Sequence, residues 1–484
     1  MKKFLNKVFK IEENQTTIKT EIIAGITTFF AMCYIIIVNP NQMTGFLQID
    51  GASQIWNACF IGGILAAVIA TLCMAFIANK PFALAAGMGL NSFFYVSFII
   101  PCLLFDKETG GLIKAETPLV DGYQAGLVII LLSGVIFLLL SVTGLRKYIA
   151  KALPSSLKTA IPAGIGLFIA FIGLQNSGIV VPNQYTAVAL TNFTQGPATA
   201  IPAIVAFIGL MLIIIFTKSK VKVLNKTAII LGILCSSALY YICCLIFKVE
   251  IPKVSSISIG TTFKDWFEVG LGGCFKGFKT VFEGKLLGGV ISVVMLAITY
   301  SLVDMFDTLG TVYGASAEAG MLDENGDPID LGKEMLCDAI GTVVGAGTGT
   351  STITTFVESS AGVAAGGRTG LAALVTASLF IVCLFASPIV KYVPQCATAS
   401  ALMYVGILMC KNIVKVDFSD IASAATAFIT FIMMIATYSI SNGIMIGAIT
   451  YVIITLLTGK YGKKDIVVTI IALLGILRFA FVAM

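Results

Sequence analysis

Four carboxylate side chains lie inside apolar segments in the second half of the chain. They are Asp304 and Asp307 in VISVVMLAITYSLVDMFDTLGTVYG, Asp338 in MLCDAIGTVVG, and Glu358 in GTSTITTFVESSAGVAAGG. A charge at the middle of a bilayer costs ~3 kcal/mol on insertion scales, so four unpaired charges would cost roughly 10–14 kcal/mol. Because stability alone does not explain that cost, these acids predict a site for a substrate, an ion or a proton.

Asp304 and Asp307 are three residues apart, which makes them neighbours on one face of a helix. Two carboxylates this close in an apolar medium repel each other, and the repulsion favours binding of a proton by one of them. The alternative is that both acids are solvated at the cytoplasmic end of their span. The apolar residues that follow them, LGTVYGASA, favour a buried pair that carries a proton.

Two apolar segments contain residues that weaken a helix. The third has Pro81, Gly87 and Gly89 before Asn91, and the tenth has GAGTGTSTITTF before Glu358. Irregular backbone cannot face lipid, so these stretches must be buried in protein or line a cavity. Paired broken helices at corresponding positions of two halves point to the midplane site of a transporter.

Each polar residue beside the predicted breaks has a structural alternative. Glu358 would lie in the first turn of a half-helix, where free N–H groups favour a polar ligand, but it could instead only cap that helix. Asn91 could contact a ligand or join two helices by a hydrogen bond. Asp338 lies one span before Glu358, and we expect it to brace the site by hydrogen bonding rather than to touch a ligand.

The composition is that of a polytopic helical membrane protein. The chain has 484 residues, of which 58% are hydrophobic and 12% charged, whereas soluble domains carry about 25% charged residues. The absence of histidine excludes a Ser-His-Asp triad, a histidine metal site and a histidine proton relay, so carboxylates must handle any proton. GAGTGTST lacks the Gly-Lys-Ser/Thr ending of a phosphate loop, and the 12 cysteines form no metal or disulfide pattern. We therefore expect no enzyme, cofactor, metal or nucleic-acid partner.

The distribution of Lys and Arg predicts the topology. Residues 1–20 form a basic tail, and the loops 144–158 and 218–226 are also basic, which places all three in the cytoplasm. The loop 248–285 has aromatic residues at helical spacing with lysines between them, which predicts amphipathic helices on the outer membrane surface. This loop divides the chain into two halves of seven spans, and an odd number of spans per half inverts the second copy. The segment 459–484 contains a further apolar stretch of uncertain topology.

Several motifs resemble those of the AzgA-like guanine/hypoxanthine permeases, a branch of the nucleobase:cation symporter 2 (nucleobase–ascorbate transporter) family. The motifs are GITTFFAMCYIIIVNP, AGMGLNSFF, SLVDMFDTLGTVYG and GTSTITTFVESSAGVAAGGRTGL. The resemblance implies an all-α membrane protein of about 14 transmembrane helices, arranged as a 7+7 inverted repeat like uracil permease, with short antiparallel strands in spans 3 and 10. It assigns residues 21–143 and 286–390 to a substrate-binding core domain, and 159–247 and 394–458 to a gate domain.

The resemblance also implies the site. The residues implied as substrate contacts or their neighbours are Asn91, Phe93, Asp304, Asp307, Thr308, Phe356, Glu358 and Ser359. Of these, Asp304, Asp307 and Glu358 are expected to couple transport to protons, and Asp338 to support them.

The implied function is proton-coupled import of a purine nucleobase into the cell across the plasma membrane by an elevator-like movement. Hypoxanthine or guanine is expected before adenine, and family analogy adds a homodimer formed through gate helices. A carboxylate such as Glu358 can accept hydrogen bonds from guanine N1–H and its amino group. The alternatives are an anion transporter of the same architecture, such as a sulfate permease, and a nucleobase facilitator without ion coupling. An anion site would require a cation near the midplane, where the sequence places neither Lys nor Arg.

Overall fold

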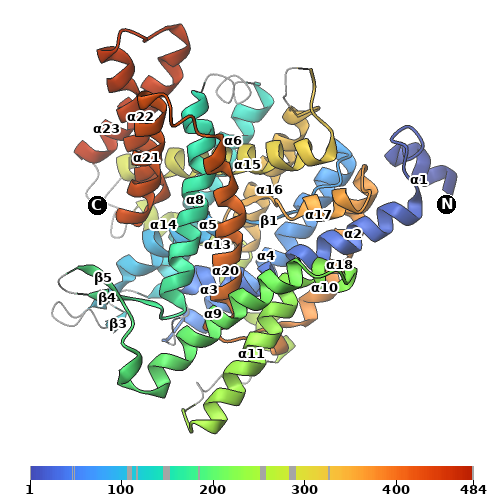
Figure 1. Cartoon of the computed structure of the whole chain (residues 1–484), viewed down its shortest axis with the longest axis vertical. Coiled ribbons are helices and arrows are strands. Elements are labelled where there is room, and N and C mark those ends of the chain that lie inside the picture. Colours follow the sequence, from blue (N-terminus) through green and yellow to red (C-terminus); the bar gives the residue numbers. More distant parts are fainter. Residues whose placement is uncertain are drawn as a thin grey trace.

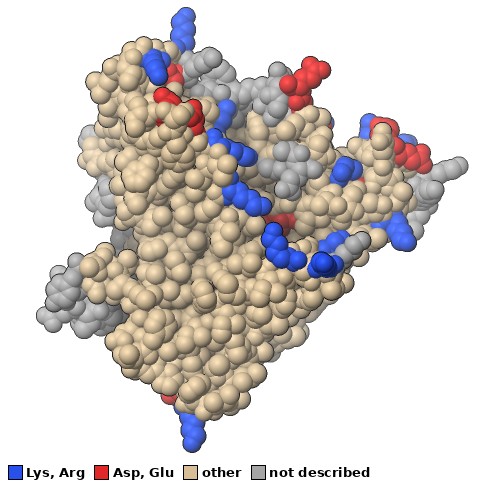
Figure 2. Space-filling view, viewed as in Figure 1, with Lys and Arg blue, Asp and Glu red and all other residues tan. Residues whose placement is uncertain are grey.

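The computed structural model describes residues 2–45, 47, 49–105, 112–115, 118–144, 153–183, 186–250, 258–282, 290–324 and 328–481. Within these residues, nine helices are long and apolar enough to cross a membrane, and four further apolar helices are shorter. Figure 2 shows a broad uncharged area over the lower half of the visible face, while Lys and Arg gather along its upper right side. The predicted polytopic helical fold is confirmed, and the number of fourteen spans stays a prediction.

One group of helices comes from the two segments predicted as the core. Within it, α16 packs against both α4 and α6, while α2 packs against α17 and α18. The members are α2 (Ile18–Met32), α3 (Ile35–Thr44), α4 (Ala52–Cys73), α5 (Met88–Phe94), α6 (Leu119–Val142), α15 (Val290–Ala319), α16 (Leu331–Thr348), α17 (Ser359–Ala364) and α18 (Gly370–Val382).

A second group contains the helices of the segments predicted as the gate. Helix α8 packs along α20 and α21, and the α8 and α20 ribbons run side by side through the centre of Figure 1. The members are α8 (Ser155–Asn176), α9 (Pro197–Thr217), α11 (Ala228–Ile246), α20 (Gln395–Cys410), α21 (Ile421–Ala436) and α22 (Ile440–Leu457). We keep the names core and gate for the two groups.

The two predicted helix breaks meet as a pair of strands. Strand β1 (Leu84–Ala86) pairs antiparallel with β6 (Ile353–Thr355), and all six residues are buried. The hydrogen bonds from Gly87 N to Thr352 O (3.1 Å) and from Phe356 N to Ala83 O (3.0 Å) extend the ladder. Backbone polar groups inside a membrane must find partners within the protein, and each broken span supplies them to the other. The predicted strands in spans 3 and 10 are thereby confirmed.

The described residues of the segment 248–285, which is predicted to be an outer loop, pack on the core. They form α12 (Ile259–Asp265), the short π-helix η5 (Trp266–Gly270), α13 (Gly273–Lys276) and α14 (Phe278–Phe282). These elements contact α4 and α6. Trp266 Nε1 donates to Thr348 O (2.7 Å), and Gly272 N donates to Gly347 O (2.8 Å). These contacts satisfy carbonyl groups at the end of α16 that its own helix cannot reach.

The two ends of the chain also form helices. Near the N-terminus, α1 (Lys2–Phe9) is held by a hydrogen bond from Asn79 Nδ2 to Phe9 O (3.0 Å). Near the C-terminus, α23 (Ile466–Phe481) packs against α22, and Arg478 Nη1 donates to Ser441 Oγ (2.6 Å). The apolar C-terminal stretch is therefore a helix attached to the gate.

The remaining elements are short. Two hairpins pair β2 (Leu103–Phe105) with β3 (Leu112–Ala115) and β4 (Val180–Asn183) with β5 (Ala187–Leu190). Short helices and turns are α10 (Lys222–Lys226), α19 (Ser387–Val390), η1 (Met74–Ala78), η2 (Tyr95–Ile99), η3 (Ile100–Cys102), η4 (Phe193–Gln195), η6 (Cys383–Phe385), η7 (Lys411–Lys415) and η8 (Lys463–Asp465).

Candidate functional site

A cavity lies where the β1–β6 strand pair faces the gate helices. The space between its lining residues, counted together with the open solvent at its mouth, is about 430 Å³. The core supplies Gly87, Met88, Gly89, Asp307, Thr311, Thr354, Thr355, Phe356, Val357 and Glu358, and the gate supplies Ile169, Val405, Leu408 and Met409. A ligand held here would touch both helix groups at once.

Two acids lie on the wall of this cavity, and no Lys or Arg is among its lining residues. Asp307 comes from α15, and Glu358 comes from the turn between β6 and α17. The missing side chain of Gly87 leaves room beside them, because a Cβ there would lie 3.5 Å from Asp307 Oδ2 and 3.2 Å from Thr354 Cγ2. The wall therefore combines carboxylates, Thr hydroxyl groups and apolar surface, a set suited to a neutral ring with polar edges.

Tyr34 holds Glu358 in place. Its hydroxyl donates to Glu358 Oε1 at 2.6 Å and lies 3.9 Å from Sδ of Met88, another residue of the cavity wall. Tyr34 is fully buried at the turn between α2 and α3. The sequence interpretation missed it, although a single hydroxyl within the apolar run FFAMCYIIIV was a usable signal.

The neighbouring acids Asp304 and Asp307 face different surroundings. Asp304 is fully buried and does not line the cavity, and its Oδ2 accepts a hydrogen bond from Thr342 Oγ1 (2.9 Å) on α16. Asp338 also lies behind the wall, where it accepts hydrogen bonds from Thr308 Oγ1 and from Thr355 Oγ1 (3.5 Å). The supporting role of Asp338 toward a ligand stays a prediction. Thr342 was missed, yet it follows Asp338 by four residues and so shares its helical face.

Other predicted residues pack behind the cavity. Asn91 Nδ2 donates to Asn39 Oδ1 (3.0 Å), and its Oδ1 accepts from Ser351, so its amide joins three segments of the core. The ring of Phe93 stacks on Tyr300 at 4.5 Å.

Eight residues were predicted as substrate contacts or their neighbours, and the structure brings some of them together. Ser359 Oγ accepts from Ala83 N (3.0 Å), which fixes the chain before β1. The cavity wall holds Asp307, Phe356 and Glu358, while Asn91, Phe93, Asp304, Thr308 and Ser359 lie among its supports. Their roles toward a substrate stay predictions.

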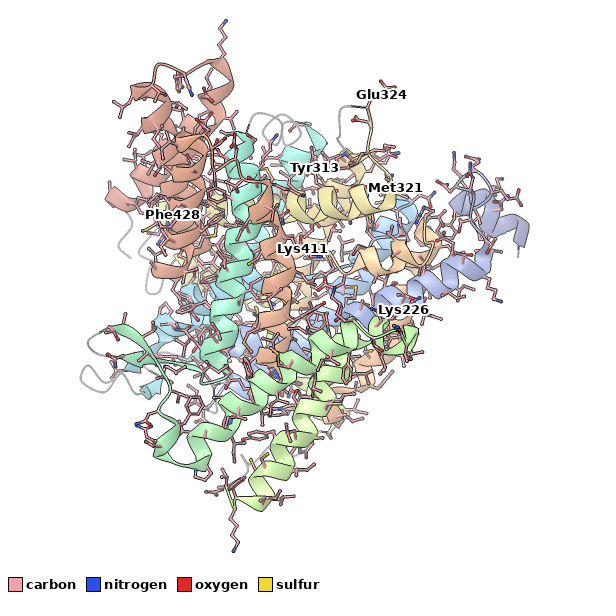
Figure 3. The ribbon with its side chains drawn as sticks, in the orientation of Figure 1. Lys226, Tyr313, Met321, Glu324, Lys411 and Phe428 are labelled. Atoms are coloured by element: carbon pink, nitrogen blue, oxygen red, sulfur yellow. The ribbon has the colours of Figure 1, made fainter. Side chains whose placement is uncertain are left out.

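Glu358 also lines a larger cleft between core and gate. This cleft has an empty volume of about 1610 Å³ and is lined by Lys226, Tyr404 and Leu408 among others. Lys226 Nζ donates to Thr27 Oγ1 (3.0 Å), and Figure 3 shows Lys226 at the end of α10 beside α2. Glu358 lines both the cavity and this cleft, which Lys226 and Asn225 of the segment 218–226 also line.

Among the residues that the structure describes, no group of three or more Cys, Asp or Glu side chains is arranged to hold a metal ion. The lining residues of the cavity offer carboxylates, hydroxyl groups, backbone groups and apolar surface.

Comparison with known proteins gives one consistent result. Residues 19–446 match the Permease family, the nucleobase:cation symporter 2 family. The adenine permease AdeQ of Escherichia coli is 33% identical over 479 residues, which cover 99% of this chain and 96% of AdeQ. The guanine/hypoxanthine permease PbuO of Bacillus subtilis is 35% identical over 471 residues, 96% of this chain and 98% of PbuO.

A solved structure with a similar fold is the transmembrane domain of the cyanobacterial bicarbonate transporter BicA. It matches with a TM-score of 0.59 and 15% identity over 87% of this chain and 96% of that domain. At this identity the likeness concerns the fold alone.

Proposed function

Because the chain belongs to the Permease family of nucleobase:cation symporters, we propose that it imports a purine nucleobase together with a proton. The observation that carries this proposal is the cavity between core and gate with Asp307 and Glu358 on its wall. The relatives support the substrate class, since their names include adenine and guanine/hypoxanthine permeases.

The edges of the purines favour hypoxanthine and guanine over adenine. Both bases carry an N1–H donor, and guanine adds its amino group, so an ionised Glu358 can accept hydrogen bonds from that edge. Adenine has an acceptor at N1 and offers only its amino group on the same edge. Carbonyl O6 and N7 need donors, which a protonated Asp307 or backbone N–H groups after β1 would supply. Phe356 is the aromatic side chain on the wall that can cover a ring face.

A proton would remove the charge that resists movement of the site. Two carboxylates in a low-dielectric cavity repel each other, and a proton shared with the base relieves that repulsion. In the proposed elevator-like cycle, the core then moves against the gate with base and proton bound. Glu358 also lines the cleft beside Lys226, and in the proposed topology this cleft gives the base an exit toward the cytoplasm. The proposal places the N-terminus in the cytoplasm and the protein in the plasma membrane, and includes a homodimer through gate helices.

The cavity argues against an anion as the substrate, although BicA shares the fold. Two carboxylates and no lining Lys or Arg would repel a bound anion. The remaining alternative is a nucleobase facilitator without ion coupling. Its uptake, unlike that of a symporter, would be insensitive to a protonophore.

The proposal is tested by an uptake assay in cells that express the chain. The assay measures uptake of labelled hypoxanthine, guanine, adenine and uracil, with and without a protonophore. We expect concentrative uptake of purines that the protonophore abolishes. The Asp307→Asn variant should still bind base but lose pH-driven accumulation, while Asp417→Asn, at an exposed position after η7, serves as the matched control. Uptake by Asp307→Asn equal to that of the control would reject the coupling role, and uptake insensitive to the protonophore would establish the facilitator.

A further inference from the structure

A chain of polar groups leads from the cavity into the interior of the core. Thr354 lies on the cavity wall, and its hydroxyl is 3.2 Å from that of Thr308. The Thr308 hydroxyl in turn donates to Asp338 Oδ2. All three side chains are almost fully buried, and the hydrogen bonds can be oriented in one direction, from the cavity toward Asp338.

The chain of polar groups continues along α16 toward its N-terminal end. Glu334 precedes Asp338 by four residues, which places the two acids on one face of the helix and about 6 Å apart along its axis. Glu334 is 0% exposed, and among the residues that the structure describes neither of its carboxylate oxygens has a hydrogen-bond partner, although Lys80 lies at ion-pair distance. Buried carboxylates without a hydrogen bond are rare, and a bound water is one of the ordinary explanations. A water between Glu334 and Asp338 would fill the gap in the chain.

From Glu334 the polar groups reach the surface. Lys80 Nζ lies 4.0 Å from Glu334 Oε1 and 3.9 Å from Asp330 Oδ2, and the Asp330 side chain is 39% exposed. Asp330 begins α16 on the side predicted to be cytoplasmic. The charged and titratable groups around Glu334 are Lys80 and Asp330 at its outer side and Cys337 and Asp338 on its own helix.

We propose that the proton released from the cavity reaches the cytoplasm through the core, by way of Thr354, Thr308, Asp338, a water and Glu334. At each hydroxyl, an arriving proton binds a lone pair while the resident proton passes to the next acceptor, so no residue changes its net charge after the transfer. The base leaves through the cleft between core and gate, and the proton leaves by this separate path. This inference rests on the proton-coupled transport proposed above.

The full-length chain reconstituted in liposomes allows a test with two measurements. Exchange of labelled for unlabelled hypoxanthine requires no net proton movement. Net uptake driven by a pH gradient does require proton movement, and a pH dye inside the liposomes records the proton influx. The Glu334→Gln variant should keep exchange within twofold of the unmodified chain and lose at least tenfold in pH-driven uptake. The control is Glu324→Gln, because Glu324 is an exposed acid at the turn after α15, as Figure 3 shows.

Equal pH-driven uptake by Glu334→Gln and the control would overturn the proposal. If Glu334→Gln loses both activities, the double variant Lys80→Met with Glu334→Met decides, because it leaves no unpaired buried charge. Exchange without pH-driven uptake in the double variant supports the path. Normal pH-driven uptake in it, or loss of both activities, assigns the pair a structural role and refutes the path. Failure of the proposed function itself is distinct, since the unmodified chain would then show no proton influx with hypoxanthine.

Discussion

Replacing Tyr34 by Phe tests whether this hydroxyl positions Glu358 for the base. The change removes one hydrogen bond of 2.6 Å to a carboxylate and little else, because the side chain is buried and keeps its ring. A hydrogen bond to a charged group contributes about 1.5–3 kcal/mol. The bond exists before the base binds, so this energy sets the largest loss in binding: at 1.4 kcal/mol per factor of ten, the affinity for hypoxanthine should fall by more than twofold and at most about 100-fold.

This expectation is checked by measuring the binding of labelled hypoxanthine to the purified protein in detergent. The unfolding temperature is measured on the same samples. Tyr95→Phe is the matched control, because it makes the same change on η2, away from the cavity wall. An affinity that stays within twofold of the control would show that Tyr34 does not position Glu358. A tighter affinity would also refute the reasoning, since it would mean that the hydroxyl competes with the base for Oε1.

Three further changes have defined outcomes. The Cβ that Gly89→Ala adds would lie 2.9 Å from Ile440 Cδ1 across the core–gate contact. Turnover measured as uptake should therefore fall a few-fold, while the affinity for the base changes less than twofold. A drop in affinity without a drop in turnover would contradict this. Trp266→Phe leaves the half-buried Thr348 carbonyl at the end of α16 without its donor, so the free energy of unfolding should fall by about 1 kcal/mol. An unchanged unfolding temperature would argue against the capping role. Hydrogen bonds from the backbone and side chain of a serine at the start of α21 lower the pKa of Asp420. The contribution of Asp420 to stability is therefore present above the ordinary aspartate pKa of about 4 and is lost as the pH falls below it. Asp420→Ala should lower the unfolding temperature at pH 7 and have less effect at pH 3, and equal effects at both pH values would refute this.

The helix breaks could be predicted because their cause is local. Glycine, proline and β-branched residues weaken a helix wherever they occur, and the bilayer then requires the freed backbone groups to find partners. The residues predicted the two breaks, the family resemblance implied a short strand in each, and the structure pairs these strands as β1 and β6. Glu358 and Phe356 reached the cavity wall for the same reason, since both directly follow the second break.

The orientation of α15 could not be predicted from spacing. Asp304 and Asp307 share a helical face, yet one contacts α16 and the other the cavity, because the rotation of the helix between its neighbours decides which acid faces which partner. Tyr34 is 324 residues from Glu358 in the sequence, so only the assembled fold brings them together. The gate residue Ile169 is one of several apolar residues of α8, so its residue type alone does not identify it as part of the cavity wall.

The segment 248–285 shows what amphipathic spacing leaves open. Its position on the outer membrane surface stays a prediction, and its described part contacts α4 and α6. The same alternation of aromatic and basic residues suits an apolar face that meets lipid or one that meets protein. Composition alone does not distinguish these two surfaces.

The register of the β1–β6 pair constrains how the gene can change. Leu84 pairs with Thr355, Ala85 with Thr354 and Ala86 with Ile353. Inserting or deleting one codon in either strand would turn every following side chain to the opposite face of the ribbon. Thr354 would then lose its contact with Thr308, and Thr355 its hydrogen bond to Asp338. Each strand can therefore accept substitutions separately, but the two can change their length only together.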